Sequence, residues 1–425
     1  MIRFYNGKVL TFDNGVKISD TDEVWTDGSK ISYVGPFKEQ MPEFDREVDL
    51  KGNVLMPSFK NAHTHTAMTF LRSYADDLPL DKWLNTMIFP AEAKLTHELL
   101  YTSTKIGIME YLTSGISASF DMYFKNETYV KANIESGFRT VIVSSMNNFD
   151  ADMTLMEEEY LKYNSCNDLV SYFLGNHAEY TTSLDRLEYV AGLVQKYKAP
   201  FFSHNSETKS EVEGCISRYG KTPTQLYDSL GVYDYGGGGY HCVWFNDEDI
   251  EIFKKHNCYV VTNPASNAKL ASGIAPITKF MEKGVNLAIG TDGASSNNAL
   301  DMFREMYLIM VLQKLQNMDA AACDPEKVLE MACVGGARAM NLYDCDNIAV
   351  GKKADMIVID LMRPNMQPVH NIVKNIVYSG SKDNVKMTMI NGVIRYEDGK
   401  FYIGDDPSAI YEENNRLIKE QILGK

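Results

Sequence analysis

The two ends of the chain share one pattern of apolar and polar positions. Residues 1–55 alternate between the two kinds and contain turn signals such as Asn6-Gly7, Asn14-Gly15 and Asp27-Gly28, which is typical of short antiparallel strands. Residues 355–360, 375–379 and 386–394 are also strand-like, with a hairpin signal at 391–392. We therefore expect residues 1–55 and 350–425 to form one small β-sandwich domain, in which residues 412–425 are a solvated helix.

Between these ends, short apolar runs alternate with longer stretches whose apolar residues recur every three or four positions. The longer stretches, for example residues 99–113 and 184–197, predict helices. Strands that alternate with helices favour a parallel barrel, so we expect residues 56–349 to form a TIM-like (β/α)8 barrel. Glycines 236–239 precede the sixth run and indicate a strand that is short or closely approached by another backbone. The candidate strands are residues 54–57, 116–122, 140–144, 170–174, 200–203, 240–243, 259–262 and 286–290.

His63 and His65 follow the first of these apolar runs. In an extended strand alternate side chains point the same way, so the two imidazoles project into one space, as two ligands of a metal ion do. The pair alone is weak evidence, because histidines two positions apart more often share an ordinary polar face.

Other metal-competent residues stand at the ends of later strands. His177, His204 and Asp292 each follow a predicted strand, and His241 lies within the sixth one. The C-terminal ends of barrel strands meet at one face, so these side chains are expected to gather there. Taken singly, a turn aspartate at 292 and a satisfied core histidine at 241 are the better interpretations, whereas the joint pattern favours a site.

The chemistry of these residues suits one divalent ion per chain. Imidazoles with one carboxylate are ligands for zinc or ferrous iron, whereas magnesium and calcium prefer oxygen. Such an ion lowers the pKa of a bound water to about 7 and so creates a nucleophile. Asp292 is expected to accept the proton of that water, and His241 to hydrogen-bond the attacking oxygen. The predicted ligands are His63, His65, His204 and Asp292.

Glu207, three residues after His204, is a second carboxylate for this site. From the loop after the strand it can reach a heteroatom of a substrate without binding the ion, as a general acid needs. The alternative is a solvated carboxylate at the start of the next helix. The fourth strand ends in Gly175-Asn176-His177 and offers no lysine to bridge two ions, so a mononuclear site is expected.

The composition narrows the choice of partners. The 425 residues include 42 basic and 57 acidic ones, which gives a formal net charge of −15. A negative net charge does not favour binding to nucleic acid or to an anionic membrane. The seven cysteines form no CxxC pair, and no apolar run reaches the roughly 18 residues of a membrane span. We expect a cytoplasmic, homo-oligomeric protein that acts on a neutral or cationic small molecule, without a nucleic-acid or membrane partner.

Several longer motifs, taken in order, resemble those of one family. They resemble the amidohydrolase superfamily and, within it, the 5′-methylthioadenosine/S-adenosylhomocysteine deaminases and triazine hydrolases. The resemblance covers nearly the whole chain. The motifs are residues 57–65 (PSFKNAHTH), 71–78 (LRSYADDL), 204–207 (HNSE), 263–270 (NPASNAKL) and 290–298 (GTDGASSNN).

The resemblance implies roles for individual residues, and the four predicted ligands match the metal ligands of the family. Glu207 matches the residue that protonates the purine ring, and His241 matches the histidine that orients the water. Glu92 matches a carboxylate that holds ribose hydroxyls, while Trp83 and His177 match further substrate contacts. Without the resemblance, Glu92 would be interpreted as a carboxylate at a helix start.

The sequence departs from the family at two places. His177 is followed by Ala178-Glu179-Tyr180-Thr181, where relatives usually have Ser-Pro-Tyr-Thr. Ser144 or Ser145 stands where many relatives have an arginine that meets the polar tail of the larger substrate. Both departures concern specificity rather than metal chemistry.

We therefore expect hydrolytic deamination of a 6-aminopurine nucleoside. A nucleoside with a small or apolar 5′ group, such as 5′-methylthioadenosine, is expected to be a better substrate than S-adenosylhomocysteine. Adenosine and 5′-deoxyadenosine are further candidates. One alternative is an aminohydrolase or chlorohydrolase that acts on another heterocycle, of the triazine, pterin, guanine or cytosine type. An alternative of another class is a non-catalytic barrel scaffold.

Overall fold

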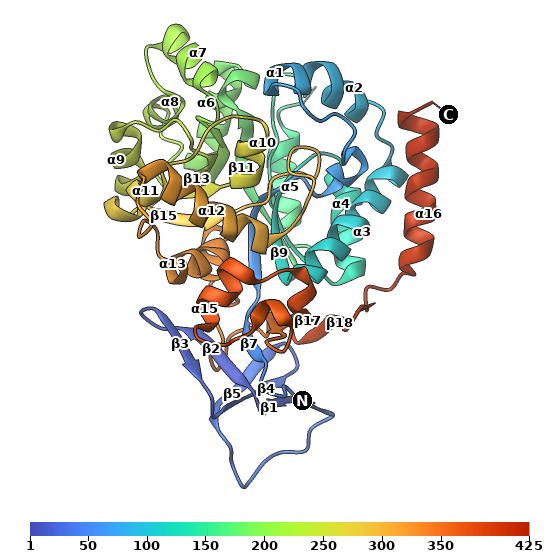
Figure 1. The fold of residues 1–425 in the computed structure, drawn as a ribbon. Coiled ribbons are helices and arrows are strands. Elements are labelled where there is room, and N and C mark those ends of the chain that lie inside the picture. Colours follow the sequence, from blue (N-terminus) through green and yellow to red (C-terminus); the bar gives the residue numbers. More distant parts are fainter. Residues whose placement is uncertain (151, 425) are drawn as a thin grey trace.

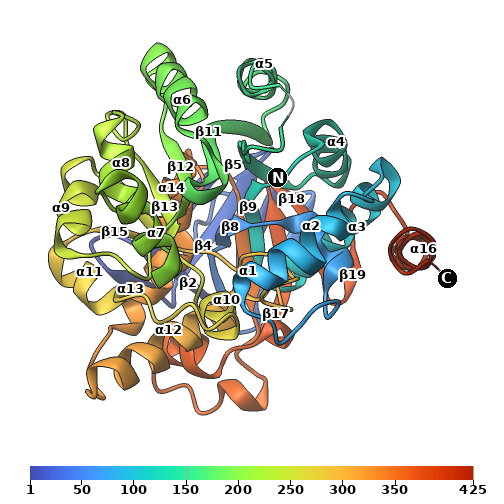
Figure 2. The same cartoon turned by 90° about the horizontal axis from the view of Figure 1, so that it is seen from above.

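Eight parallel strands form the central sheet of the computed structural model, which describes residues 1–150 and 152–424. The strands lie in chain order, and the sheet closes where the N–H of Asp292 donates to the carbonyl oxygen of His63 (3.0 Å). Helices surround the strands (Figure 2), so the predicted (β/α)8 barrel is confirmed. The strands are β8 (Phe59–Thr64), β9 (Ile116–Met122), β10 (Arg139–Val143), β11 (Val170–Ala178), β12 (Phe201–Asn205), β13 (Gly237–His241), β14 (Tyr259–Thr262) and β15 (Asn286–Ile289).

The barrel helices agree with their sequences in two respects, the residue at which a helix begins and the face that it buries. The Thr96 side chain accepts a hydrogen bond from the N–H of Leu99 and caps α3, and α6 buries Leu187, Val190 and Val194 along one face. The helices predicted over 99–113 and 184–197 are confirmed. The helical segments are η1 (Thr66–Leu71), α1 (Leu80–Lys82), η2 (Trp83–Ile88), α2 (Phe89–Glu92), α3 (His97–Thr113), α4 (Asn126–Ser136), α5 (Leu155–Tyr163), η3 (Glu179–Thr181), α6 (Leu184–Tyr197), α7 (Lys209–Tyr219), α8 (Pro223–Ser229), α9 (Asp247–Lys255), α10 (Pro264–Lys269), α11 (Ile277–Lys283), α12 (Met302–Asn317), α13 (Pro325–Glu330), η4 (Met331–Gly335) and α14 (Gly336–Ala339).

The first barrel strand is β8, and the prediction that residues 54–57 fill this place is wrong. Those residues form β7 (Val54–Pro57), which pairs with β16 (Met356–Ile359) in a different sheet. The chain passes from one sheet to the next at Ser58, so two buried strands follow each other almost without a break. The apolar run therefore marks a strand correctly but does not show which sheet it joins. His63 consequently lies within the first barrel strand rather than after it.

Two further sheets, built from both ends of the chain, lie below the barrel in Figure 1. Phe4 and Val24 of the smaller sheet share one buried core with Leu55, Met356 and Met389 of the larger, which is the sandwich predicted for the two termini. The smaller sheet contains β5 (Lys30–Pro36), β4 (Asp22–Asp27), β1 (Ile2–Tyr5) and β6 (Arg46–Asp49). The larger contains β19 (Lys400–Phe401), β18 (Val393–Glu397), β17 (Val385–Ile390), β16, β7, β2 (Lys8–Phe12) and β3 (Val16–Ser19).

A buried ion pair joins the barrel to these sheets. Arg139 of β10 donates from Nε to Oδ2 of Asp355 (2.9 Å) and from Nη2 to Oδ1 (3.1 Å). The main chain of Asp355 also accepts a hydrogen bond from the hydroxyl of Ser58 (2.9 Å), at the point where β7 ends. Both side chains of the pair are almost completely buried.

For the C-terminal part, one prediction is wrong and another is right only in part. Residues 375–379 are helical, because α15 (Ile372–Lys374) continues into η6 (Asn375–Ser379) and buries Val373, Ile376 and Val377. The predicted C-terminal helix is present as α16 (Pro407–Leu417) and η8 (Ile418–Ile422), and half of its residues are exposed. One face is not solvated, because α16 packs beside α3 (Figure 1) and Asn414 donates to the hydroxyls of Thr102 and Ser103. Residue 425 lies outside the described part. The remaining segments are η5 (Pro364–Met366) and η7 (Lys382–Asn384).

The sixth barrel strand, predicted over residues 240–243, lies over Gly237–His241 and so contains three of the four glycines. A Cβ atom at Gly237 would overlap the carbonyl oxygen of Phe201 in β12, and one at Gly238 would overlap the carbonyl oxygen of Tyr259 in β14. The expected close approach of another backbone is therefore confirmed, on both sides of β13. In the part of the chain that the structure describes, no helix has the length and apolarity needed to cross a bilayer.

Candidate metal centre and active site

The predicted ligands converge at the C-terminal ends of the barrel strands. His63 belongs to β8 and His65 follows it directly, His204 belongs to β12, and Asp292 follows β15. Nε2 of His65 lies 3.3 Å from Oδ1 of Asp292, and Nε2 of His63 lies 3.6 Å from the same oxygen. The ring centroids of His63 and His204 are 4.8 Å apart.

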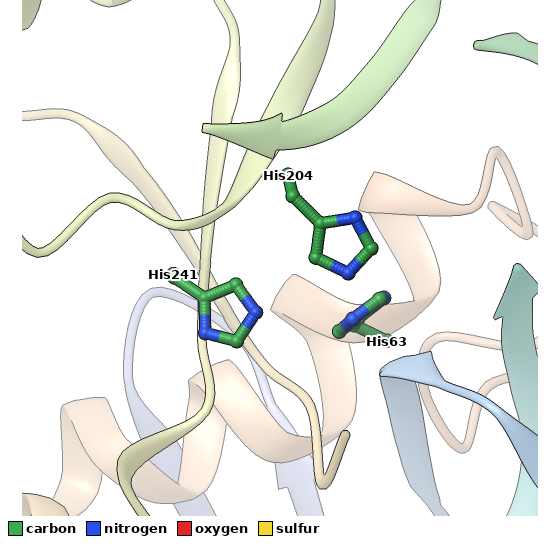
Figure 3. A group of neighbouring side chains, drawn as sticks. All are labelled: His63, His204 and His241. Atoms are coloured by element: carbon green, nitrogen blue, oxygen red, sulfur yellow. The ribbon is translucent and has the colours of Figure 1, made fainter. Parts of the chain in front are cut away.

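The side chains at this centre suit a cation as ligands, and the environment of His63 gives the physical reason. This side chain is completely buried, and neither ring nitrogen has a hydrogen-bond partner in the protein, an arrangement that costs free energy unless something binds there. Within residues 1–150 and 152–424, two groups of side chains are close enough to share an ion. They are His63, His204 and His241 (Figure 3), and His63, His65 and Asp292, with the ligand atoms of each group within 4.8 Å of one another.

Backbone carbonyls fix the orientation of two imidazoles. Nδ1 of His65 donates to the carbonyl oxygen of Met122 (2.5 Å), and Nδ1 of His204 donates to that of His177 (2.6 Å). Because a carbonyl oxygen can only accept, each ring presents its Nε2 to the centre without a proton when it is neutral. Such hydrogen bonds behind the ligands are typical of metal sites.

Asp292 is held by hydroxyls and by its own turn. Ser266 and Ser296 donate to Oδ2 (2.5 and 3.0 Å), the N–H of Gly293 donates to Oδ1 (2.7 Å), and the backbone is left-handed with φ of 60°. Burial alone would raise the pKa of this carboxyl, but the hydrogen bond and charge of His65 bring it well below its usual range. In the same pair, burial lowers the pKa of His65, and Asp292 raises it to about 9.

Glu207 lies beside His241, one of the histidines of this cluster. Its Oε2 is 3.8 Å from Nε2 of His241, and its Oε1 accepts a hydrogen bond from the hydroxyl of Ser272 (3.0 Å). Burial raises the pKa of Glu207, which favours the protonated form that a general acid needs. Nδ1 of His241 faces Oδ1 of Asn267 at 2.7 Å, so the ring is fixed with Nε2 toward Glu207.

A cavity of about 500 Å³ opens over these groups and is lined by the predicted substrate contacts Trp83, Glu92 and His177. Burial raises the pKa of Glu92 to about 7, and the same carboxyl accepts a hydrogen bond from Tyr123 (2.6 Å). Burial lowers the pKa of His177 to about 4, so its ring is neutral at physiological pH.

The outer part of the cavity is largely aromatic. Phe89 and Phe149 approach each other with ring centroids 5.8 Å apart, and Phe124 also lines the wall. Ser145, where many relatives have arginine, lines the cavity and donates to the carbonyl oxygen of Tyr123 (3.1 Å). Two charged side chains of opposite sign, Lys125 and Asp150, also line the cavity, and neither belongs to a motif that the sequence analysis identified.

Sequence reasoning also missed the residues that hold the functional groups. Ser266, Asn267 and Ser272 support Asp292, His241 and Glu207, and Tyr123 supports Glu92. The first three lie in or beside the motif over residues 263–270, which marked the region but not the partners. Tyr123 directly follows β9, and its place at a strand end was the available signal.

Comparison with known proteins shows which family the chain resembles. The profile of the Amidohydrolase family matches residues 54–395. The 5-methylthioadenosine/S-adenosylhomocysteine deaminase of Caldicellulosiruptor saccharolyticus is 35% identical over 420 residues, which cover 97% of this chain and 98% of that protein. The 5'-deoxyadenosine deaminase of Methanobrevibacter smithii is 38% identical over 400 residues, 92% of each protein.

A solved structure extends the similarity to three dimensions. An adenosine deaminase from Xanthomonas campestris, crystallised with bound zinc, superimposes with a TM-score of 0.94 at 30% sequence identity. The match covers 100% of this chain and 99% of that one, so it includes the terminal sheets as well as the barrel.

Proposed function

This chain belongs to the amidohydrolase family, and from that premise we propose that it hydrolyses the 6-amino group of an adenosine-type nucleoside to give the inosine analogue and ammonia. The observation that carries the proposal is a cluster of side chains that could hold a cation, His63, His65, His204 and Asp292, with the buried carboxyl of Glu207 beside it in the same cavity. The names of the relatives supply the class of substrate.

We propose zinc as the ion, because the ligand types suit it and the related adenosine deaminase was crystallised with it. When bound, a divalent ion acts as a Lewis acid that makes water a nucleophile near neutral pH. The residues that would hold it are His63, His65, His204 and Asp292, and His241 is near enough to assist.

The side chains of the protein carry the protons of the reaction. Glu207 donates a proton to the ring nitrogen beside the amino-bearing carbon, which makes that carbon electrophilic. Asp292 accepts a proton from the attacking water, and His241 hydrogen-bonds the oxygen that adds to the ring. The proton held by Asp292 then passes to the amino group, and the carbon–nitrogen bond breaks to release ammonia. The remaining hydroxyl proton of the adduct returns to the Glu207 carboxylate as the carbonyl group of the inosine analogue forms.

The outer cavity sets the choice of nucleoside. Glu92 accepts hydrogen bonds from the ribose hydroxyls, and Trp83 and His177 contact the nucleoside from the walls. The rings of Phe89, Phe124 and Phe149 suit an apolar 5′ group. Ser145 offers no cation for a carboxylate tail, and the charges of Lys125 and Asp150, which also line the cavity, sum to zero. We therefore propose that 5′-methylthioadenosine and 5′-deoxyadenosine are better substrates than S-adenosylhomocysteine.

The test is ammonia release from adenosine, 5′-deoxyadenosine, 5′-methylthioadenosine, S-adenosylhomocysteine and adenine by protein loaded with zinc or iron. Activity on the nucleosides with little on adenine supports the proposal. A further arm with a triazine, a pterin, guanine and cytosine tests the other heterocycles. Turnover confined to that arm contradicts a nucleoside substrate, and no turnover in either arm by metal-loaded protein favours a non-catalytic barrel.

A further inference from the structure

Glu211 is a buried carboxyl to which the reaction described above assigns no role. It is the third residue of α7 and is 5% exposed. Its Oε1 accepts a hydrogen bond from the N–H of Ser206 (2.9 Å), and its Oε2 accepts one from the N–H of Glu207 (2.8 Å). Both oxygens therefore bind the loop that carries the proposed general acid.

This loop has a conformation that needs support. Ser206 has a left-handed backbone with φ of 53°, which non-glycine residues adopt only when neighbouring groups hold it. The carbonyl oxygen of Ser206 accepts a hydrogen bond from the N–H of Trp244 (2.9 Å), in the loop that follows His241. The segment bound by Glu211 therefore also links the loops that follow β12 and β13.

The side chain of Glu207 is held from the other side. Its Oε1 accepts a hydrogen bond from the hydroxyl of Ser272, and its Oε2 lies 3.8 Å from Nε2 of His241. With the backbone fixed by Glu211 and one oxygen fixed by Ser272, the position of the second oxygen in the cavity is determined. A shift of about 1 Å in such a group can cost about 100-fold in rate.

We propose that Glu211 is a positioning residue, which holds Glu207 so that its carboxyl meets the ring nitrogen of the nucleoside. This role rests on the proposed function. It requires a carboxylate, because two N–H groups donate to two different oxygens. A glutamine amide has a single oxygen, and its NH2 group would face one of the two N–H donors.

The experiment is a double-mutant cycle of Glu207→Gln and Glu211→Gln in the metal-loaded chain, with 5′-methylthioadenosine as substrate. Glu213→Gln is the matched control, since Glu213 lies on the same helix with an exposed side chain that pairs with Lys209. Metal content and thermal stability are measured for every variant.

If Glu211 positions Glu207, Glu211→Gln lowers kcat by roughly 10- to 100-fold, changes KM by less than about threefold, and retains the metal. In the Glu207→Gln background the same substitution then lowers kcat by less than about twofold, because Glu211 acts on the reaction through Glu207. Glu211→Asp keeps both oxygens on a shorter arm and is expected to retain more activity than Glu211→Gln.

Several outcomes would overturn this role. They are an additive loss in the double variant, a Glu211→Gln protein as active as Glu213→Gln, and loss of the metal with Glu211→Gln. If Glu211→Gln does not fold, the same cycle with Glu211→Asp decides by the same additivity criterion. An active wild type with an unaffected Glu211→Gln refutes only this inference, whereas a wild type that releases no ammonia from any nucleoside refutes the proposed function and this role with it.

Discussion

The hydroxyl of Tyr123 donates a hydrogen bond to Oε1 of Glu92 at 2.6 Å, and both residues line the cavity above the candidate metal centre. The bond fixes the orientation of a carboxyl that would otherwise rotate. A carboxyl fixed in this way is suited to accept hydrogen bonds from a vicinal diol. Removing the carboxyl should therefore slow the reaction only of substrates that contain such a diol.

Glu92→Ala is therefore expected to lower kcat/KM for the nucleosides by about 10-fold or more, and to leave the low activity on adenine unchanged. The measurement is kcat/KM on 5′-methylthioadenosine, 5′-deoxyadenosine and adenine for the wild type and the variant. Equal losses on all three would show that Glu92 supports the fold rather than the ribose.

Glu92 also predicts a pH dependence of stability. Burial raises its pKa to about 7 in the folded protein, above the value of about 4.3 for an unfolded chain. The unfolded state therefore ionises first, and the contribution of Glu92 to stability is full below about pH 4, falls as the pH rises and is lost above about pH 7. Glu92→Gln should raise the melting temperature at pH 8 but not at pH 4.5, and an equal effect at both values contradicts the assignment.

The ion should depend on His65. His65→Ala is expected to lose both the bound ion and turnover, as measured by elemental analysis and ammonia release. Because Asp292 raises the pKa of His65 to about 9 in the ion-free protein, an ion must displace a proton there at neutral pH. Its affinity should weaken by about tenfold for each unit of pH lost below that value. An active variant without stoichiometric metal would remove His65 from the ligand set.

Glu207 should act on the substrate and not on the ion. Glu207→Gln is expected to keep one ion per chain and to lose a factor on the order of 100 or more in kcat, as removal of a general acid does. Elemental analysis and steady-state kinetics separate the two effects. A variant that lost its ion would make Glu207 a ligand instead.

The ion pair between Arg139 and Asp355 should matter for stability rather than catalysis. Replacing Asp355 with Ala leaves a buried guanidinium without its partner and is expected to lower the free energy of unfolding by about 3–5 kcal/mol. The exposed pair of Lys17 and Asp13 is the control, and Asp13→Ala should cost less than about 1 kcal/mol. Chemical denaturation measures both, and similar small losses would show that the buried pair adds nothing to the junction.

The strand ends, and the histidines that stand at them, could be predicted because both are recognised from the local pattern of apolar and polar residues. The convergence of His63, His204 and Asp292 follows from the rule that parallel strands end at one face of a barrel. In contrast, nothing local distinguishes the sheet of residues 54–57 from that of residues 59–64, since both segments are fully buried.

The remaining errors have a similar cause. Residues 375–379 contain a short apolar run that fits both a strand and a short buried helix, and only the packing of Ile376 and Val377 distinguishes the two. The contacts from Ser272 to Glu207 and from Tyr123 to Glu92 join segments that follow different strands. Hydroxyl groups are common along the chain, and their partners become known only when the loops are placed in space.

The pairing of β7 with β16 also has a consequence for how the chain is made. On a ribosome, β7 and its neighbour β2 emerge early, whereas β16 emerges only after all eight barrel strands. Throughout that interval one edge of β7 has no partner, and an open strand edge is a template for pairing with other chains. The sheet beneath the barrel is therefore among the last parts to be completed during synthesis, even though its first strands are made at the start.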